Sequence, residues 1–521
     1  MRTPITGDDA PRPWDEADYN LARRFLDPAP GDRVALVTAE GPTTYGQLRT
    51  LVNQIGNVLL DLGVGQGDRV LIAMRDGVEY VATWYAVQRI GAITVDVYSH
   101  LSVEEHRYNL GYLEPSLVVT DGAVLETMRA AGMPRMLVLE PKPGGLLAGE
   151  HDFGKLVAMA PTSLAAVVTA ADDIAMWKLT TGSTGHPKAC RHRARSAWLS
   201  YQWVGRDALG LRPDDVVLAV PKLFSGYARD MTALYAMGAG ATGVLFPERT
   251  TPERIFEAVA RHRPTVLVNV PTMMRSMLDH PDAARADLGS LRMCLSAGEQ
   301  LSPDLHRRWL DGFGVEVLDC VGSTEAFNAF ICNRPGQVRP GSLGRVVEHY
   351  TATVTDQAGA PLPDGEVGVL EVTGEPVGVD YWKSPDKTAS TFPAPGTLRT
   401  GDLFRRDADG YYYYEGRADD LLKVRGRFVA PTEVENRIAA HPGVAACAVV
   451  GYPAADGLTG LRAFVVRREE VSAEQVSAEE IRRHAKAGLA AHKCPQEIRF
   501  VAVLPQTPTG KIDRKQLRVT G

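Results

Sequence analysis

The sequence has 521 residues, 45% of them hydrophobic, and a formal net charge of −6. At roughly 100–200 residues per domain, this length predicts two to four folding units with large cores. The slightly acidic balance gives no basic field that would gather phosphate backbones, so we expect no nucleic-acid partner.

Export, membrane insertion and cysteine-based frameworks are also disfavoured. Residues 1–18 are rich in Asp, Arg and Pro and lack the apolar core of a signal peptide. The longest uncharged stretch, 231–247, is interrupted by glycines and is too short to span a bilayer. The six cysteines include no CxxC pair, so neither a zinc site nor a disulfide framework is expected. These features predict a soluble, cytoplasmic protein with no membrane partner.

Short β-branched runs alternate with helical patterns between residues 69 and 319. Such alternation predicts an α/β fold with layered, largely parallel sheets, in which ligands bind at the strand ends. The expected strands are 69–74, 94–98, 117–120, 136–139, 265–270, 291–295 and 315–319, and the expected helices are 79–90, 252–262 and 303–312.

The pattern restarts after the Gly-Arg-Ala-Asp-Asp segment at 416–420. We therefore expect residues 1–418 to form a large N-terminal domain and residues 419–521 to form a small, mobile α+β C-terminal domain. The elements expected in the small domain are helices 431–440 and 478–491 and strands 445–450, 462–467 and 498–503.

The strongest local motif is Thr-Thr-Gly-Ser-Thr-Gly-His-Pro-Lys at 180–188. Its glycines allow a tight turn in which successive backbone N–H groups point at one anion. The hydroxyl groups of Thr181, Ser183 and Thr184 add donors, and Lys188 adds positive charge. The spacing differs from GxxxxGK[ST], which excludes a P-loop NTPase. The motif predicts a polyphosphate site, and the alternative is an ordinary polar surface loop.

Three further segments suit the same chemistry. The segment from Asp319 to Glu325 follows a strand and ends in a carboxylate suited to Mg²⁺. Asp402 lies in a Thr-Gly-Asp turn, where a carboxylate can accept from both ribose hydroxyls, and Lys511 lies on a Pro-Thr-Gly-Lys loop. Taken singly, Glu325 or Asp402 would be explained as a turn or capping residue, and Lys511 as a solvated surface residue.

In this order, the segments resemble the acyl-adenylate-forming superfamily of acyl- and aryl-CoA ligases, adenylation enzymes and luciferases. The resemblance extends from about Thr43 to Lys511. It implies an enzyme that uses ATP to convert a carboxylic acid to its acyl-adenylate and then passes the acyl group to a thiol. Catalytic roles fall on Lys511, Glu325 and Thr184, of which Glu325 and Thr184 would hold Mg²⁺. Nucleotide contacts are implied for Thr181, Gly182, Ser183, Lys188, Ala297, Gly298, Glu299, Asp319, Cys320, Val321, Gly322, Ser323, Thr324, Asp402 and Arg417.

The expected roles agree with the electrostatics of the reaction. A carboxylate and a triphosphate repel each other, so Mg²⁺ and a lysine must neutralise the charge that gathers between them. By resemblance, Lys511 bridges the carboxylate and the α-phosphate, and a hinge at Asp419 lets the small domain rotate so that the thiol can approach. The sequence departs from the family at Val321, usually an aromatic residue, and at Ala189, usually glycine.

Residues 221–227 and 322–336 resemble benzoate-CoA ligases most closely. In those ligases small neutral residues follow the pocket tyrosine, whereas here Tyr227 is followed by Ala-Arg-Asp, ending at Asp230. A desolvated carboxylate there would pair with an ammonium group. The pattern therefore resembles the stand-alone β-amino-acid adenylation enzymes of macrolactam polyketide pathways, which load the phosphopantetheine thiol of an acyl carrier protein.

The expected acid pocket includes no cation, so we expect a hydrophobic β-substituent on the substrate rather than a second carboxylate. Three alternatives remain open. Asp230 could pair only with Arg229 or cap a helix, the protein could be an aryl-CoA ligase that uses free CoA, or it could be a non-catalytic nucleotide-binding relative. The expected pocket residues are Asp230, Val220, Phe224, Ser225, Gly226, Tyr227, Asn328, Ala329 and Phe330.

Overall fold

The computed structural model describes residues 18–142, 144–181, 186–424, 427–454, 459–468, 476–505 and 512–519. The chain forms two compact units. The first comprises Met1–Leu301, Leu305–Ala352 and Val372–Arg399, and the second comprises Ser302–Asp304, Thr353–Glu371 and Thr400–Gly521. The second unit thus takes in segments that precede residue 419, and the domain boundary expected there stays a prediction.

One mainly parallel sheet of the first unit carries the segments expected to bind nucleotide and acid. Neighbouring strands from β14 to β1 are parallel, whereas β2, β15 and β16 are antiparallel to their neighbours. In sheet order its strands are β16 (Arg345–Val346), β15 (Ala329–Cys332), β14 (Val317–Gly322), β13 (Met293–Ser296), β12 (Val266–Asn269), β10 (Val216–Ala219), β11 (Thr242–Val244), β1 (Val34–Thr38) and β2 (Gly41–Thr44).

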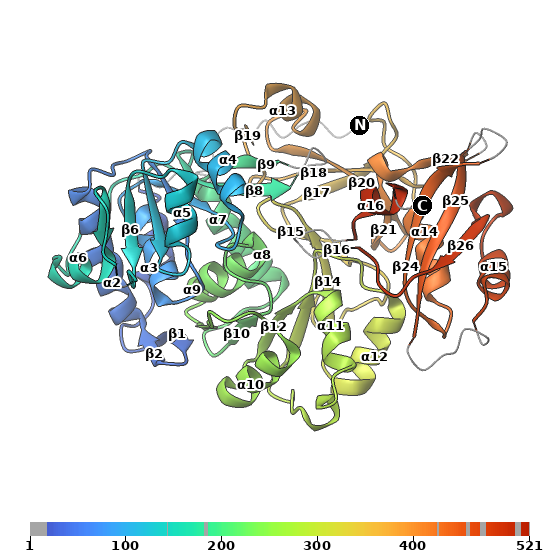
Figure 1. The fold of residues 1–521 in the computed structure, drawn as a ribbon, viewed down its shortest axis with the longest axis horizontal. Coiled ribbons are helices and arrows are strands. Elements are labelled where there is room, and N and C mark those ends of the chain that lie inside the picture. The colour runs from blue at the N-terminus through green and yellow to red at the C-terminus, as the bar shows by residue number, and fades with distance from the viewer. Residues whose placement is uncertain are drawn as a thin grey trace. The chain divides into compact units, whose positions relative to one another are not determined.

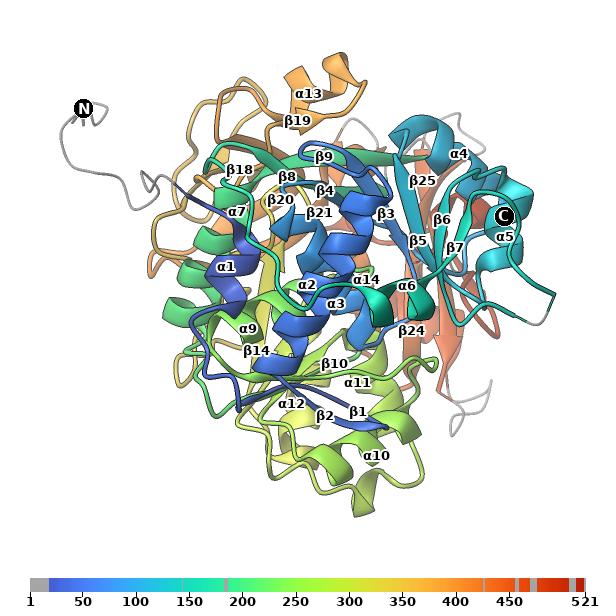
Figure 2. The same cartoon turned by 90° about the vertical axis from the view of Figure 1, so that its left-hand side faces the viewer.

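A second mainly parallel sheet carries the predicted phosphate loop at one edge. Every residue of β4 and β5 is buried, as expected for central strands covered by helices on both faces. In Figure 2, α2 and α3 run side by side. In sheet order the strands are β19 (Asp380–Tyr381), β9 (Pro187–Arg193), β8 (Ile174–Thr181), β4 (Ile93–Asp96), β3 (Arg69–Ala73), β5 (Leu117–Asp121), β6 (Met136–Leu139) and β7 (Glu150–Asp152).

The helices between the strands begin and end at recognisable signals. A capping box of Ser102 and Glu105 starts α4, and Thr251 caps α10, whose first residue is Pro252. The helices before residue 400 are α1 (Leu21–Leu26), α2 (Tyr45–Asp61), α3 (Val78–Arg89), α4 (Val103–Leu113), α5 (Leu125–Ala131), α6 (Phe153–Met159), α7 (Ala194–Ser200), η1 (Tyr201–Ala208), α8 (Gly226–Arg229), η2 (Asp230–Tyr235), α9 (Ala236–Gly238), α10 (Pro252–His262), α11 (Pro271–Leu278), η3 (Ala283–Arg285), α12 (Pro303–Phe313) and α13 (Pro385–Thr391). Of these, η1 and η2 are π-helical turns, which often mark functional sites.

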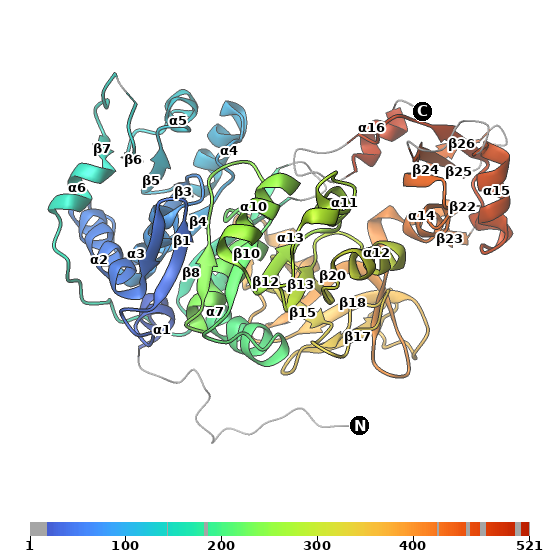
Figure 3. The same cartoon turned by 90° about the horizontal axis from the view of Figure 1, so that it is seen from below.

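The second unit contains most of a four-stranded sheet in the order β17-β18-β20-β21. It also contains a three-stranded sheet in which β24 and β25 are antiparallel and β26 is parallel to β25. In β24 and β25, alternate side chains face opposite sides, so α14 and α15 cover one face and α16 the other (Figure 3). Its elements, together with those that lead into it, are β17 (Thr351–Thr355), β18 (Gly368–Thr373), β20 (Thr397–Arg406), β21 (Tyr412–Arg417), η4 (Ala418–Asp420), β22 (Leu422–Val424), β23 (Arg427–Val429), α14 (Pro431–Ala439), β24 (Val444–Pro453), β25 (Thr459–Arg467), α15 (Ala478–Lys486), η5 (Ala491–Lys493), β26 (Glu497–Phe500) and α16 (Arg514–Val519).

The predicted α/β class with layered parallel sheets is confirmed, and most expected elements lie within a few residues of their predicted bounds. The helix expected at 478–491 ends at Lys486, two residues before Gly488, a residue type that disfavours continuation of a helix. Within the described ranges, no helix is long and apolar enough to cross a membrane.

A dense apolar core lies between the first sheet and the helices that follow its strands. Figure 1 shows α10, α11 and α12 gathered beside β10, β12 and β14. Trp309 on α12 is fully buried in this core, and its ring meets that of Phe313 edge-on at 4.8 Å. The neighbouring Leu310 is 47% exposed, because it lies on the outer face of the same helix.

We predict that Trp309→Ala lowers the free energy of unfolding by about 3–5 kcal/mol, since it removes a large buried ring and leaves a cavity. Leu310→Ala, one residue away, is the matched control and should change stability by less than about 0.5 kcal/mol. Urea unfolding followed by far-UV circular dichroism measures both. Equal shifts in the two variants would contradict the assigned core.

Candidate functional site

The predicted phosphate loop follows β8 and precedes β9, which pair as antiparallel strands next to the edge strand β19 of the second sheet. Thr181 ends β8, and Lys188 lies on β9 directly opposite Thr180. The hairpin thus holds the base of the loop in place. Gly182, Ser183 and Thr184, the centre of the predicted phosphate site, lie outside the described residues.

Glu325, the predicted Mg²⁺ ligand, is oriented by a tyrosine that the sequence reasoning missed. The hydroxyl group of Tyr381 donates a hydrogen bond of 2.5 Å to Glu325 Oε1, and the Lys188 ammonium lies 5.1 Å from the centre of the same ring. Tyr381 lies on β19, opposite Cys190 of β9. One buried ring therefore links the lysine of the phosphate loop to the carboxylate. Within the described part of the chain, the other oxygen of Glu325 has no hydrogen-bond partner, as suits a metal ligand.

A buried histidine holds the residue before this glutamate. His192 Nε2 lies 2.8 Å from the carbonyl oxygen of Thr324. Burial, with the nearby Lys178 ammonium, lowers the pKa of His192 to about 3, so the ring is neutral at pH 7. Since a carbonyl oxygen only accepts, Nε2 carries the proton and donates. His192 therefore fixes the backbone from which Glu325 projects.

The turn between β14 and β15 requires a glycine at 322, because a Cβ there would lie 2.4 Å from the carbonyl oxygen of Asn328. Within the turn, the Ser323 hydroxyl accepts from the backbone N–H of Ala326. Phe327 has a φ of 73°, a left-handed conformation that a non-glycine residue adopts at a cost of about 1–3 kcal/mol. The turn brings Gly322, Ser323 and Thr324 together beside Glu325. Asp319, Cys320 and Val321 precede them on β14.

The segment after β13 also lies at the carboxyl end of a parallel strand. Ala297 is buried, and Gly298 has a φ of 82°, which favours glycine. Glu299 accepts hydrogen bonds from the backbone N–H and the hydroxyl group of Thr272, at 2.9 and 2.6 Å. Burial raises the pKa of the Asp319 carboxyl, which lies on the neighbouring strand opposite Ser296. Their expected nucleotide contacts stay predictions.

Asp230, the expected amine receptor, is buried with three protein donors on its carboxylate. Lys178 Nζ and Asn328 Nδ2 donate to Oδ2 at 2.6 and 3.0 Å, and Arg229 Nη2 donates to Oδ1 at 2.9 Å. Arg229 also pairs with Asp96. The pairing with Arg229 that we kept as an alternative is therefore present, although it is not the only pairing. An incoming ammonium would have to displace or join these donors, so the amine-receptor role stays a prediction.

The four charged side chains, Lys178, Arg229, Asp230 and Asp96, form what we call the buried quartet. Their side chains are at most 4% exposed, and their formal charges sum to zero. They come from β8, α8, η2 and β4. Tyr80 on α3 adds a hydrogen bond of 2.6 Å to Asp96. Removing one partner from a buried ion pair typically costs about 3–5 kcal/mol, so the quartet fixes these elements to one another.

The expectation that no cation lies by the acid pocket is corrected by Lys178. Its ammonium donates to the carbonyl oxygen of Phe327, next to Asn328, and lies against Gly226, where a Cβ would be 2.9 Å from Nζ. The residue was overlooked because it lies within the apolar strand Ile174–Thr181. A charge in such a strand is itself a signal, since isolated lysines are seldom fully buried.

The other expected pocket residues lie on the segments that lead to the quartet. Phe224 packs against Tyr98, with ring centres 4.6 Å apart. The hydroxyl group of Tyr227 is buried, has no hydrogen-bond partner in the described ranges, and has a raised pKa because of that burial. Val220 continues from the end of β10, Ser225 precedes α8, and Ala329 and Phe330 begin β15.

In the second unit, the structure brings together the two residues expected near the ribose. Asp402 on β20 faces Arg417 on β21, and Arg417 Nη1 donates to Asp402 Oδ1 at 2.9 Å. Asp419, the expected hinge, lies in the short helical turn η4. Lys511, the expected catalytic lysine, lies outside the described residues.

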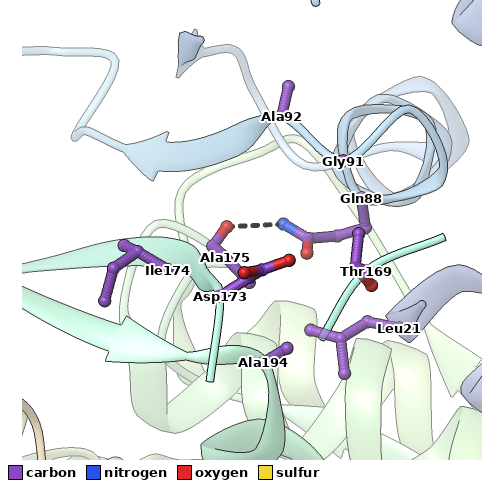
Figure 4. Close-up of a pocket in the computed structure, with 9 residues that line it drawn as sticks. All are labelled: Leu21, Gln88, Gly91, Ala92, Thr169, Asp173, Ile174, Ala175 and Ala194. Atoms are coloured by element: carbon purple, nitrogen blue, oxygen red, sulfur yellow. Dashed lines mark hydrogen bonds between the residues drawn. The ribbon is translucent and has the colours of Figure 1, made fainter. Parts of the chain in front are cut away.

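A small pocket between α1, α3 and the start of β8 is separate from these residues (Figure 4). Its wall includes Ile174, and Gln88 spans it by donating to the carbonyl oxygen of Ala175 at 2.8 Å. At about 3.3 Å per residue, the phosphate loop begins about 20 Å further along β8. None of the predicted site residues lines this pocket.

Comparisons with known proteins identify the family to which the chain belongs. Residues 23–382 match the AMP-binding enzyme family, and residues 433–511 match the AMP-binding enzyme C-terminal domain. The chain belongs to the AMP-binding enzyme family. It is an AMP-forming acid–thiol ligase that uses ATP to adenylate a carboxylic acid, and its resemblance to benzoate-CoA ligases is confirmed.

Three relatives illustrate the similarity. The benzoate–CoA ligase of Thauera aromatica is 36% identical over 98% of this chain and 96% of its own length. The 3-hydroxybenzoate–CoA/4-hydroxybenzoate–CoA ligase of the same organism is 34% identical over 94% of each chain. The crystal structure of the anthranilate CoA ligase AuaEII in complex with anthranoyl-AMP is 33% identical, covers 97% of this chain and 98% of its own, and superposes with a TM-score of 0.89.

We predict that Tyr381→Phe lowers the rate of ATP–pyrophosphate exchange about tenfold or more and raises the Mg²⁺ concentration needed for half-maximal rate. The variant removes a hydrogen bond to a charged group, typically worth about 1.5–3 kcal/mol, and leaves Glu325 free to rotate. Tyr413→Phe is the matched control, because the Tyr413 hydroxyl also donates to a carboxylate, Asp407. An unchanged Mg²⁺ requirement in Tyr381→Phe would exclude the orienting role.

Proposed function

We propose that the protein is an aryl-CoA ligase, which activates an aromatic acid with an uncharged ring as its aroyl-adenylate and transfers the aroyl group to the thiol of coenzyme A. The observation that carries the proposal is the charge balance at the pocket. Both oxygens of Asp230 already accept hydrogen bonds from cationic side chains, those of Lys178 and Arg229. The two positive and two negative charges of the quartet cancel, so the quartet adds no net charge to the pocket. A neutral ring suits such a wall better than an ammonium group does. The similarity to ligases of benzoate and hydroxybenzoates supports the same substrate class.

The residues around Glu325 suit a magnesium–nucleotide complex. Mg²⁺ typically takes one or two carboxylates and completes its shell with phosphate oxygens and water. In the described ranges no cluster of three or more acidic, His or Cys side chains is placed to hold a metal ion, so Glu325 would act as a single carboxylate ligand beside the phosphates. Mg²⁺ would reduce the repulsion between phosphates and carboxylate. Lys188 would contribute charge from the phosphate loop, while Tyr381 and His192 hold Glu325 in position.

A β-amino acid and the phosphopantetheine thiol of an acyl carrier protein form the second candidate pair. The acidic side chain at 230 favours it, because benzoate-CoA ligases carry small neutral residues in this segment. The bridging role of Lys511 and the hinge role of Asp419 are proposed for either substrate. The two candidates differ in what Asp230 does, and this difference can be measured.

A substrate panel tests the proposal directly. We expect ATP–pyrophosphate exchange with benzoate and with hydroxy- and aminobenzoates to exceed that with 3-amino-3-phenylpropanoate and 3-aminobutanoate. Thioester formation should then be faster with coenzyme A than with a phosphopantetheinylated carrier protein. The opposite order in both assays would exclude the aryl-CoA ligase and favour the β-amino-acid enzyme.

We predict that Asp230→Asn lowers kcat/KM for substituted and unsubstituted benzoates alike and lowers the unfolding temperature. The variant leaves the charges of Lys178 and Arg229 compensated only by Asp96, which typically costs about 3–5 kcal/mol at a buried site. If Asp230 instead received an ammonium, the loss would fall on 3-amino-3-phenylpropanoate and spare 3-phenylpropanoate. The control is Asp214→Asn, whose side chain is 68% exposed and pairs with Arg212 at the surface.

A further inference from the structure

Lys178 lies on β8, the strand that leads to the predicted phosphate loop, and its ammonium contacts Asp230 and Gly226, two residues expected to line the acid pocket. It lies three residues before Thr181, the last residue of β8, and its side chain is 4% exposed. A lysine side chain usually keeps its ammonium in water, so complete burial needs compensation from fixed partners. Burial lowers the pKa of Lys178 to about 8, although the Asp230 carboxylate opposes the shift.

The fixed partners account for two of the three N–H groups of the ammonium. One donates to Asp230 Oδ2 at 2.6 Å, and another donates to the carbonyl oxygen of Phe327. The Phe327 ring lies below the nitrogen, 3.9 Å from its centre. No further oxygen or nitrogen acceptor for Lys178 occurs in the described part of the chain, which leaves its third N–H only the weakly accepting ring. A buried donor left without an acceptor typically costs about 1–3 kcal/mol, so a ligand that brings an acceptor gains affinity.

The neighbours of the ammonium show which side of it a ligand could reach. Gly226 covers the nitrogen only with backbone, because a Cβ at 226 would lie 2.7 Å from Cε and 2.9 Å from Nζ of Lys178. Asn328 approaches from the other wall and donates to the same oxygen of Asp230. Gly226 and Asn328 are both expected to line the acid pocket. The ammonium therefore lies between two segments that are expected to line the acid pocket, beside a position that lacks a side chain.

The charge balance of the quartet limits what that ligand group can be. A carboxylate or an ammonium on the acyl group would add an uncompensated charge to a neutral, buried cluster. A neutral oxygen would not, and it could accept the third N–H directly. A ring hydroxyl group fits this requirement, and sites built to hydrogen-bond a hydroxyl reject analogues without it strongly.

We propose that Lys178 is a specificity-determining residue, which donates its third N–H to a neutral oxygen on the acid, with a hydroxybenzoate as the substrate class. The proposal rests on the aryl-CoA ligase function and names the ring substituent that the pocket selects. It also gives Gly226 a role, since the missing side chain leaves room for the ammonium.

The test compares each hydroxybenzoate isomer with the methylbenzoate of the same substitution, because methyl and hydroxyl groups are similar in size. In the parent protein, kcat/KM for ATP–pyrophosphate exchange should favour one hydroxybenzoate isomer over its methyl counterpart by tenfold or more. If no aromatic acid supports exchange, the aryl-CoA ligase function itself fails. If aromatic acids react but every methyl counterpart equals or exceeds its hydroxy acid, only the Lys178 proposal fails.

The double variant Lys178→Leu/Asp230→Asn removes one positive and one negative charge, so the quartet stays balanced. We expect it to reduce the hydroxyl-to-methyl preference tenfold or more, as a ratio measured within one protein preparation. Thermal unfolding shows whether the variant is folded. A folded double variant that keeps the parent's preference would overturn the proposal.

Gly226→Ala gives a second measurement that leaves every charge in place. The added Cβ should displace the Lys178 ammonium and so lower the hydroxyl-to-methyl preference when all other residues are unchanged. In the double variant, the shorter leucine side chain ends before the crowded atoms, so Gly226→Ala should have little further effect on the preference. An equal loss of the hydroxyl-to-methyl preference in both backgrounds, or no loss in the parent background, would contradict the contact between Gly226 and Lys178.

Discussion

The geometry of the rest of the site depends on two positive and two negative charges that are buried together. They belong to Lys178, Arg229, Asp230 and Asp96. Buried ions are tolerated only when each is paired and hydrogen-bonded, which leaves little freedom in where the elements that carry them can lie. Here the elements are the strand entering the phosphate loop, a central strand of the same sheet, and the turn of helix that borders the acid pocket. The arrangement therefore ties the segments expected to recognise the acid and to bind phosphate to one rigid cluster.

A second set of contacts orients the groups expected to meet the phosphates. Tyr381 fixes one oxygen of Glu325, and His192 fixes the carbonyl group before it. The uncharged state of His192 matters, because a protonated ring at this depth would add a positive charge beside Lys178. Adenylation brings two anions together, and preorganised partners reduce the cost of holding the charges that neutralise them. A contact of the quartet helps to maintain the left-handed conformation of Phe327, since its carbonyl oxygen accepts a hydrogen bond from Lys178.

Much of the fold could be predicted from the sequence because periodicity and capping residues act locally. The apolar runs at 117–120 and 136–139 are strands as predicted, and the helix predicted at 252–262 is present, with Thr251 as its cap. The motifs also identified the turn that carries Glu325 and the pairing partners Asp402 and Arg417. The quartet could not be predicted in the same way, because Lys178, Asp96 and Asp230 are far apart along the chain and meet only through sheet order. Tyr381 was missed for the same reason, since only the β19–β9 pairing brings it to Glu325.

The proposed role of Lys178 gives its contact with Gly226 a consequence for how this enzyme can change its substrate. Replacing the lysine alone leaves an unbalanced carboxylate, and adding a side chain at 226 alone creates a clash. A series of single substitutions therefore passes through a destabilised variant, whereas the joint replacement of residues 178, 226 and 230 does not. We therefore expect stepwise substitution at these positions to change the substrate specificity only rarely. New specificities should arise more readily by recombination that exchanges the end of β8 together with α8 and the first turn of η2.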